Sequence, residues 1–475
     1  MKRFARLLPA LLGLSLFVGC SAQTLPVALR GANVPAQLSR MSAAGNAKTM
    51  PQAMMMDNFS AWVKAQQPPK ADFAFASSEV PDGVPIEGQA VDRLPTTPGP
   101  KAFTYLTYEA LDNNLFSDLN RILDTLELVG SNPQMNLLAQ TDSFGPGNTA
   151  RYFISPDKKF DNNAPIIASP YVKLAEENSG DPRTLTQAVN WAFGAYPARF
   201  NWLNLSTHGM GFAGINYDDN PEASMNIMGF AQSVRQGLNG KKLDVVSFDA
   251  CLMATAEVGS ELQDISNIMV GSEDSTYYWG RGYAQTMAKI AQNPAAMNPD
   301  QIVRSMVLDV HSKGTSNMTL TISAIDLRKM KELEPELDRF ARSLRKALTT
   351  QKSAVIRAMQ QTREFHLGEN IPFRDLNRIL SLTKTLVKDA EVTASADRLN
   401  HILFRRGLIM LARQNRLEKG EGRGLSIYLP TDGQVAKSYL QTRLARSTQW
   451  DEFLLDLNAA IASSAPAGAP AAPAR

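Results

Sequence analysis

A nearly continuous apolar run at residues 243–248 constrains the fold more than any other feature of the sequence. Such a run is typical of a strand buried on both faces, which occurs mainly in parallel sheets covered by helices. Strand and helix patterns alternate around it, with strands expected at residues 102–107, 135–139, 151–155, 202–207 and 268–271, and helices at 115–126, 183–196 and 228–238. We therefore expect an α/β fold with a mainly parallel sheet between helices.

The C-terminal part of the chain predicts a helical elaboration of this fold. Residues 318–325 and 424–429 have strand patterns, and a long helical stretch at about 330–411 separates them. The hexapeptide Asp-Leu-Asn-Arg-Ile-Leu occurs at both 118–123 and 375–380. Because the flanking sequences diverge, we interpret the two copies as helix faces and not as a duplication.

The N-terminus has the pattern of an export signal. Lys2, Arg3 and Arg6 precede an apolar run at residues 7–18, which is too short to span a bilayer comfortably. Gly19 and Cys20 follow the run, and the segment resembles the bacterial lipobox, in which such a cysteine is lipidated and becomes the new N-terminus. The alternative is an ordinary signal peptide, and either interpretation predicts export.

Composition divides the rest of the chain. We predict a lipoprotein signal peptide at 1–19, a low-order tether or pro-segment at 20–100 and a core at 101–300. The C-terminal part of the domain follows at 301–462, and an Ala- and Pro-rich disordered tail at 463–475. A lipid on Cys20 would anchor the protein to the cell envelope. By resemblance to lipoprotein sorting, Ser21 favours the outer membrane if the cell is Gram-negative.

Charge and cysteine content exclude several classes of function. The chain has 49 basic and 46 acidic residues, and removal of the three cationic residues of the signal leaves 46 of each sign. A nucleic-acid partner is therefore not expected. With 2 Cys and 4 His in the whole chain, we predict neither a disulfide framework nor a His-rich metal site. Cys251 is the one thiol left if Cys20 is lipidated.

Two reactive side chains follow predicted buried strands. His208 begins the segment His208-Gly209-Met210-Gly211 after the strand at 202–207, and Cys251 follows the strand at 243–248. Catalytic groups gather at the carboxyl ends of strands in open α/β sheets. We also expect a helix to start near Leu252, so that its N-terminus would stabilise the thiolate of Cys251.

If the two strands are neighbours, His208 and Cys251 face each other across one cleft. The imidazole would then act as base for the thiol and later protonate the leaving amine. The backbone amides of Gly209 and Cys251 are the expected oxyanion donors. The plainer alternatives are an inert core cysteine and a structural histidine, and they weaken because both residues occupy strand ends.

The residues resemble the clostripain-like cysteine peptidases, relatives of caspases, gingipains and legumain. The resemblance rests on His-Gly-x-Gly at 208–211 and on Asp-Ala-Cys-Leu-Met at 249–253. Three weaker stretches agree, namely 112–115, 271–274 and 424–430, so that the resemblance covers about residues 102–430. One departure is Ser275-Thr276-Tyr277-Tyr278-Trp279-Gly280, where the family tends to have a Pro-Gly turn before an aromatic residue.

The resemblance implies a caspase-like fold and a cysteine endopeptidase that forms a thioester acyl-enzyme through a Cys251–His208 dyad. It also implies cleavage after Arg or Lys, with Asp249 in the pocket for the basic side chain. A carboxylate there would discriminate against neutral side chains. The alternative is that Asp249 caps the following helix. Glu273 or Asp274 would add negative charge to the pocket.

No cofactor is required for this chemistry, although some members of the family use calcium. Asp218 and Asp219 are possible calcium ligands, but an acidic surface turn explains them more simply. The expected partners are protein or peptide substrates and a membrane reached through the lipid, and the sequence does not indicate an oligomeric state.

Two other functions compete with a cysteine peptidase. A serine hydrolase of the α/β-hydrolase type requires a Gly-x-Ser-x-Gly elbow, which the chain lacks. A catalytically inactive surface lipoprotein, using the caspase-like fold as a binding module, is the alternative that we retain.

Overall fold

The computed structural model describes residues 85–159, 165–276, 281–293, 297–313, 319–365, 371–418, 420–431 and 435–464. The predicted signal peptide, Cys20 and most of the predicted tether lie outside the described residues. Residues 465–475 of the predicted tail also lie outside them.

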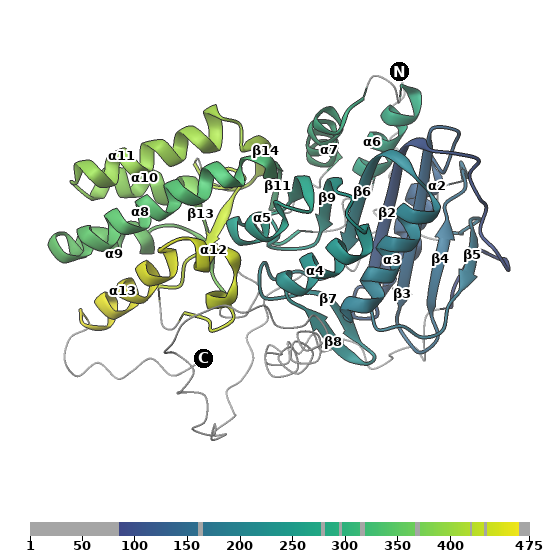
Figure 1. The fold of residues 1–475 in the computed structure, drawn as a ribbon, viewed down its shortest axis with the longest axis horizontal. Coiled ribbons are helices and arrows are strands. Elements are labelled where there is room, and N and C mark those ends of the chain that lie inside the picture. The colour runs from purple at the N-terminus through teal and green to yellow at the C-terminus, as the bar shows by residue number, and fades with distance from the viewer. Residues whose placement is uncertain are drawn as a thin grey trace, which may run out of the picture.

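A mixed sheet forms the centre of the molecule (Figure 1). Among the described residues it has ten strands, in the spatial order β1 (Gln89–Ala90), β5 (Pro170–Lys173), β4 (Thr149–Phe153), β3 (Met135–Ser143), β2 (Lys101–Leu111), β6 (Ala198–Ser206), β9 (Leu243–Asp249), β10 (Ser266–Gly271), β11 (Leu320–Asp326) and β14 (Ile409–Asn415). The neighbours from β3 to β10 are all parallel. The prediction of a mainly parallel sheet is therefore confirmed for its centre, and antiparallel pairs extend both ends.

Helices cover both faces of this sheet. One face packs against α3 (Pro182–Ala195), α4 (Ile227–Leu238) and α5 (Ala256–Leu262), and the other against α2 (Leu119–Glu127), α6 (Arg281–Gln292) and α7 (Pro299–Lys313). Alternate residues of β2 supply the two cores, because successive strand side chains point to opposite faces. Leu106 and Tyr108 belong to the first core, whereas Phe103 and Tyr105 belong to the second.

The C-terminal part forms a helical layer at the end of the sheet opposite β5 (Figure 1). Its helices are α8 (Met330–Thr350), α9 (Lys352–Gln360), α10 (Leu376–Leu386), α11 (Ala390–Asn400), α12 (Arg443–Ser447) and α13 (Trp450–Ala462). Short helical turns are η1 (Phe116–Asp118), η2 (Leu327–Lys329), η3 (His401–Arg405) and η4 (Tyr439–Gln441). The predicted helical elaboration is confirmed, and the two copies of the repeated hexapeptide lead into separate helices, α2 and α10.

The expectation of one helical stretch at 330–411 was wrong in part. A small sheet of β12 (Glu364–Phe365), β13 (Phe373–Asp375) and β15 (Ser426–Tyr428) interrupts it, and β14 begins within its end. These strands are too short to show a period of two, and β13 pairs with a strand more than fifty residues away in the sequence. Non-local pairing of this kind leaves no local pattern to read.

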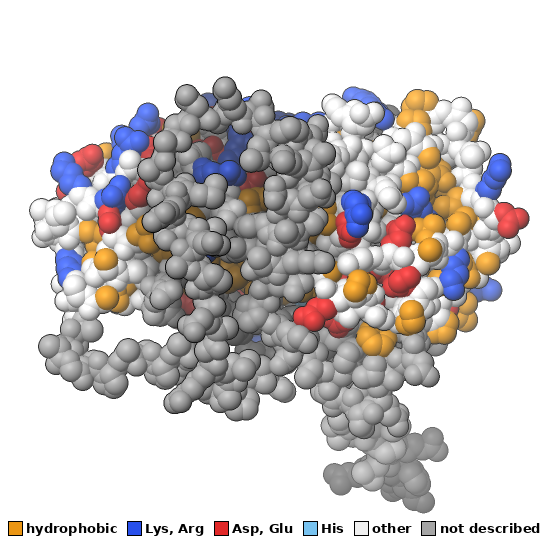
Figure 2. All heavy atoms as spheres, turned by 60° about the horizontal axis from the view of Figure 1, so that its bottom comes forward, with side chains coloured by type: hydrophobic (Ala, Val, Ile, Leu, Met, Phe, Trp, Pro, Cys, Tyr) orange, Lys and Arg blue, Asp and Glu red, His pale blue; other side chains and the backbone are white. Residues whose placement is uncertain are grey.

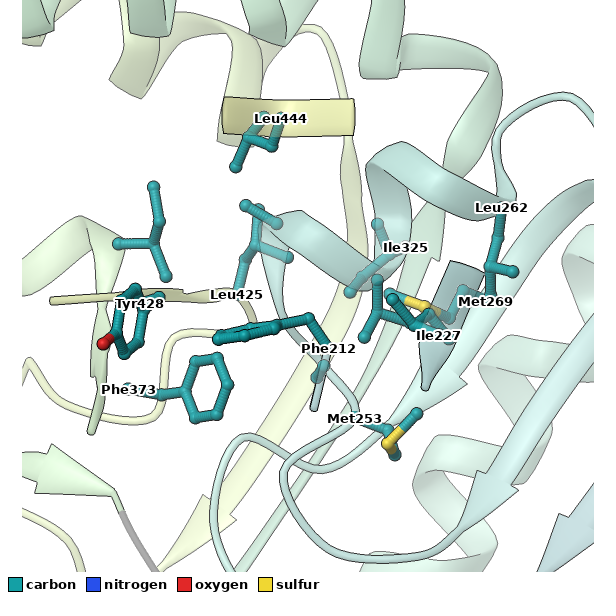
Figure 3. Packing of buried hydrophobic residues seen from close by; sticks show 14 of the residues in the cluster. Phe212, Ile227, Met253, Leu262, Met269, Ile325, Phe373, Leu425, Tyr428 and Leu444 are labelled. Atoms are coloured by element: carbon teal, nitrogen blue, oxygen red, sulfur yellow. The ribbon is translucent and has the colours of Figure 1, made fainter. Parts of the chain in front are cut away.

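Aromatic packing connects the small sheet to the centre of the molecule. Phe212, in the turn after β6, points toward Phe373 of β13 and Tyr428 of β15 (Figure 3). The ring centroids of Phe212 lie 5.8 Å from Phe373 and 5.1 Å from Tyr428, both edge-on. Ser426 also donates its N–H to the carbonyl oxygen of Ala254, at 3.0 Å. The C-terminal part therefore supports the loops that follow β6 and β9.

The last part of the predicted tether packs on the domain. β1 pairs in parallel with β5, and the hydroxyl of Tyr196 donates to the carbonyl oxygen of Pro95 at 2.9 Å.

Residues 215–219 and 222–225 form a hairpin of β7 (Ile215–Asp219) and β8 (Glu222–Met225).

Charges of both signs are mixed with apolar side chains over the described part of the face in Figure 2. Such a surface fits the balanced net charge of the chain. Within the described ranges, no helix has the length and hydrophobicity needed to cross a bilayer.

Candidate active site

The ends of β6 and β9 place His208 and Cys251 at one edge of the sheet. The two strands are parallel neighbours in which Ser206 pairs with Asp249, and Thr207 donates its N–H to the carbonyl oxygen of Asp249 at 3.4 Å. His208 and Cys251 each follow two residues after this register pair. Both residues are only 3% exposed. The structure thus brings together the two turns that the sequence singled out.

Glycines allow these turns to approach closely. A Cβ atom at Gly209 would lie 2.6 Å from the carbonyl oxygen of Cys251, well inside van der Waals contact. Gly211 has φ of +59°, and a Cβ atom there would overlap the ring of Phe373. Any side chain at Gly209 would therefore push the two turns apart.

Asn114 holds the imidazole of His208 in place. The Nε2 atom of His208 lies 2.6 Å from the Oδ1 atom of Asn114. An amide oxygen only accepts hydrogen bonds, so Nε2 carries the proton and Nδ1 of the neutral ring is left as the acceptor. Asn114 lies just beyond β2, so three neighbouring strands contribute to this edge. The tyrosine ring of Tyr217 packs edge-on against the imidazole, at 6.2 Å between centroids.

The thiol of Cys251 contacts the backbone that follows β10. Thr276 donates its N–H to Sγ at 3.2 Å, and Sγ lies 3.6 Å from the carbonyl oxygen of the same residue. The next residue, Leu252, has φ of +60°, an unusual value for a residue with a side chain. Leu252 and Ala254 donate their N–H groups to the carbonyls of Asp274 and Ser272, at 3.3 and 2.8 Å.

The prediction that a helix starts near Leu252 was wrong. Helix α5 begins at Ala256, and its cap is Thr255, whose hydroxyl accepts from the N–H of Val258 at 3.2 Å. The helix N-terminus is therefore not the group that contacts the thiol, and the N–H of Thr276 takes that position. The alternative that Asp249 caps this helix is also overturned, because Thr255 does so.

Asp249 is the last residue of β9, two residues before Cys251, and is 7% exposed. Its side chain lines a small cavity of about 10 Å³ together with Ser206 of β6 and Glu109 of β2. Glu109 was not identified from the sequence. Its position in the strand at 101–111 gave no sign that it shares a cavity with Asp249.

Asp274 and Glu273 follow β10 and face different surroundings. The Oδ2 atom of Asp274 lies 3.6 Å from the guanidinium of Arg363, so this carboxylate has a basic partner in the chain itself. Glu273 is fully buried, and its Oε2 atom accepts from the N–H of Gly424 at 2.6 Å. Burial, with a contribution from the charge of Asp375, raises the pKa of Glu273 well above its usual value. Glu273 therefore supports the C-terminal part.

Asp142 of β3 and Asp218 of β7 are buried acidic side chains that lie close together. Asp218 accepts from the N–H and the hydroxyl of Ser179, at 2.7 and 3.1 Å. Burial raises the pKa of Asp142 to about 9, with the charge of Asp218 adding to the effect. The next residue, Asp219 at the end of β7, is exposed. Within the described ranges, no group of three or more His, Cys, Asp or Glu side chains is arranged to hold a metal ion.

Comparison with known proteins gives the family. The family model described as the clostripain family of C11 peptidases matches residues 107–457. A secreted C11 cysteine protease from Bacteroides thetaiotaomicron, solved with an irreversible peptide inhibitor, is 19% identical with a TM-score of 0.53, covering 74% of this chain and 100% of that chain. No curated protein matches the sequence.

Two further solved structures are similar. A secreted C11 protease from B. thetaiotaomicron, iotapain, is 16% identical with a TM-score of 0.56, covering 74% of this chain and 100% of that chain. An inactive zymogen C11 protease from Parabacteroides distasonis is 18% identical with a TM-score of 0.51, covering 74% of this chain and 99% of that chain. These similarities confirm the caspase-like fold. Because the family model spans most of the chain, this protein belongs to the clostripain family of cysteine peptidases.

Proposed function

We propose that the protein is an endopeptidase that cleaves after Arg or Lys through a dyad of Cys251 and His208. The observation that carries this proposal is the register of β6 and β9, which sets the two residues equally far beyond the pair Ser206 and Asp249. The close approach of Gly209 to the carbonyl oxygen of Cys251 supports it, because it joins the two turns directly.

The reaction follows from the roles of the two side chains. Nδ1 of His208 accepts the thiol proton, and Sγ of Cys251 attacks the carbonyl carbon of the scissile peptide bond. The N–H groups of Gly209 and Cys251 donate to the oxygen as it gains negative charge. His208 then returns the proton to the leaving amine, which leaves a thioester on Cys251. Water, deprotonated by His208, hydrolyses the thioester and regenerates the thiol.

Asp249 is the proposed receptor for the basic side chain of the substrate. It precedes Cys251 by two residues and lines a cavity on the same side of the sheet as Ser206. A mostly buried carboxylate gains much more from a cationic partner than from a neutral one. Asp274 is a weaker second candidate, since Arg363 is already its partner.

Export and a lipid on Cys20 complete the proposal. They rest on the basic start, the short apolar run and the cysteine after Gly19. The similar proteins from B. thetaiotaomicron are described as secreted, which supports export of this chain as well. If the cell is Gram-negative, the outer membrane is the proposed site of anchoring. Activity assays with and without a chelator test the use of calcium that the family resemblance allows.

Fluorogenic peptides that end in Arg, Lys or Asp test the activity. We expect the wild-type protein to cleave the Arg and Lys peptides and Cys251→Ala to cleave none. His208→Ala should lose activity by a similar factor, because the two residues act as one unit. If the wild type and Cys251→Ala cleave all peptides equally poorly, the dyad is wrong and a binding module of the same fold becomes the better explanation.

Asp249→Asn tests the pocket. We expect kcat/KM for Arg and Lys peptides to fall by about 100-fold, with little change for a neutral peptide, because the substitution removes the charge and retains the shape. Asp157→Asn, on a loop outside the site, is the matched control. Unchanged selectivity in Asp249→Asn would refute the role of this residue.

A further inference from the structure

A second buried carboxyl group lines the cavity beside Asp249. Glu109 of β2 pairs in register with Ser206 of β6, which in turn pairs with Asp249 of β9. The three residues thus form a row across neighbouring strands and point to the same face of the sheet. Residues of α2 and Tyr283 of α6 close the other side of the cavity.

One carboxyl oxygen of Glu109 is held by a polar network, and the other is not. Glu109 is 1% exposed, and its Oε1 atom accepts from the hydroxyl of Thr107. Thr107 in turn accepts from the side-chain amide of Asn204 at 3.1 Å. Among the described residues, the Oε2 atom is buried without a hydrogen bond of good geometry, although the hydroxyl of Ser206 interacts with the carboxyl group. A buried carboxyl oxygen without a partner is costly, so a group held in this way is suited to a ligand that supplies the missing donor.

The distance from the reacting groups fits a basic side chain. The row of Glu109, Ser206 and Asp249 precedes His208 and Cys251 by two residues along the strands. Two residues span at most about 7 Å, so the Cα atoms of the row lie within about 7 Å of those of the dyad. That separation is about the reach of an Arg or Lys side chain from its Cα atom to its charge.

We propose that Glu109 is a second acidic specificity residue, which together with Asp249 receives the cationic side chain on the substrate's residue before the scissile bond. This inference rests on the proposed function. The fixed fork of a guanidinium carries several donors, so it can bind both carboxylates at once when the cavity, about 10 Å³ in this structure, widens to admit it. Asp249 alone would leave part of the guanidinium unsatisfied.

The electrostatics of the cavity couple the binding of a cation to the release of a proton from Glu109. Burial raises the pKa of Glu109 to about 8; hydrogen bonds from Thr107 and Ser206 lower it, and the charge of Asp118 raises it. The other titratable groups that line the cavity are Asp249, Tyr105 and Tyr283, and burial raises the pKa of Tyr283 well above its usual value. At pH 7 Glu109 therefore holds its proton when no cation is bound. An entering cation stabilises the carboxylate, so the proton leaves when the cation binds.

Glu109→Gln tests this inference against a matched substitution, Glu257→Gln. Glu257 is also fully buried, burial raises its pKa to about 7, and its Oε2 atom is also without a partner among the described residues, but it lies outside the cavity. We expect Glu109→Gln to lower the ratio of kcat/KM for Arg over neutral peptides by at least about tenfold. Glu257→Gln should leave that ratio unchanged.

A binding measurement gives a readout that needs no catalysis. Agmatine, a small guanidinium compound, is titrated calorimetrically at pH 7 into Cys251→Ala protein in two buffers of different ionisation enthalpy. We expect binding to release close to one proton, and the release to vanish in Cys251→Ala/Glu109→Gln. Equal affinity and equal proton release in the two proteins would overturn the role of Glu109.

The two hypotheses fail in different ways. If wild-type protein does not prefer basic residues, the proposed specificity fails and the role of Glu109 fails with it. If the wild type prefers them and Glu109→Gln retains the same preference, only the role of Glu109 is refuted. Glu109→Asp is the second variant in case Glu109→Gln does not fold. It keeps the carboxyl group and should retain part of the preference for basic residues.

Discussion

The Oδ1 atom of Asn114 accepts a hydrogen bond of 2.6 Å from Nε2 of His208, which joins the end of β2 to the end of β6. This bond sets the tautomer of the imidazole and fixes the plane of the ring. In the mechanism proposed above, it also stabilises the imidazolium that forms when the thiol loses its proton. Asn114 is thus a positioning residue that acts through His208.

Asn114→Ala should lower kcat by about 10- to 100-fold with little change in KM, because a freely rotating imidazole is seldom in the reactive orientation. Asn114→Asp should restore much of the rate, since a carboxylate also accepts from Nε2. Initial rates with an Arg peptide over a range of pH will measure both effects. Asn190→Ala, on the exposed side of α3, is the control. A proportional change in KM would show that Asn114 contacts the substrate instead.

Thr276→Pro should slow alkylation of Cys251 by iodoacetamide at pH 7 by about tenfold or more, because it removes the N–H that donates to Sγ. Thr276→Ala keeps this N–H and should react like the wild type. Peptide mapping by mass spectrometry distinguishes Cys251 from Cys20. Equal rates for all three proteins would mean that the bond does not control the reactivity of the thiol.

Gly209→Ala should reduce activity by about 100-fold, since its Cβ atom would meet the carbonyl oxygen of Cys251 and separate the two turns. The free energy of unfolding should fall by about 1–3 kcal/mol. Gly194→Ala is the matched control, because a Cβ atom at this position of α3 meets nothing within 4 Å. It should leave activity intact and stabilise the protein by about 0.5–1 kcal/mol. Full activity in Gly209→Ala would contradict the close packing of the turns.

Asp142→Asn should flatten the dependence of stability on pH. Burial raises the pKa of Asp142 to about 9 in the folded protein, and the nearby charges of Asp218 and Glu176 contribute. Between the unfolded pKa, near 4, and this value, the folded protein binds more protons than the unfolded chain, so stability falls as the pH rises. The asparagine does not ionise and avoids this loss.

Thermal melts from pH 5 to pH 9 check this prediction. At pH 8 Asp142→Asn should be more stable than the wild type by about 1–3 kcal/mol, and the gain should shrink toward pH 5. Asp92→Asn, at an exposed position, should follow the wild type. A Tm that decreases with pH as steeply in Asp142→Asn as in the wild type would show that another group titrates.

The sequence predicted the parts of the site that depend on local patterns. Residues 243–248 read as a buried strand, and His208 and Cys251 follow neighbouring strands as expected. The conformation of the turn after Cys251 could not be predicted from the residues of the turn. Backbone hydrogen bonds from Leu252 and Ala254 to the loop after β10 hold this turn, so the helix begins only at Ala256.

The site residues that the sequence did not predict were missed for one physical reason. Asn114 and Glu109 lie near the proposed site because β2 is next to β6 in the sheet. Strand order is a tertiary property, and no local sequence pattern predicts it. Arg363 is nearly ninety residues from its partner Asp274, so their ion pair could not be predicted either. Once the strand order is known, residues at the end of β2 become the natural place to look.

The order of strands at the β14 end also limits how the protein can be shortened. β11 and β14 come from the later part of the chain, yet they complete the same sheet by pairing with β10. A fragment ending near residue 300 would leave β10 as a bare edge, ready to template intermolecular pairing. We expect such a fragment to aggregate during expression, so any recombinant version should retain the sequence through α13.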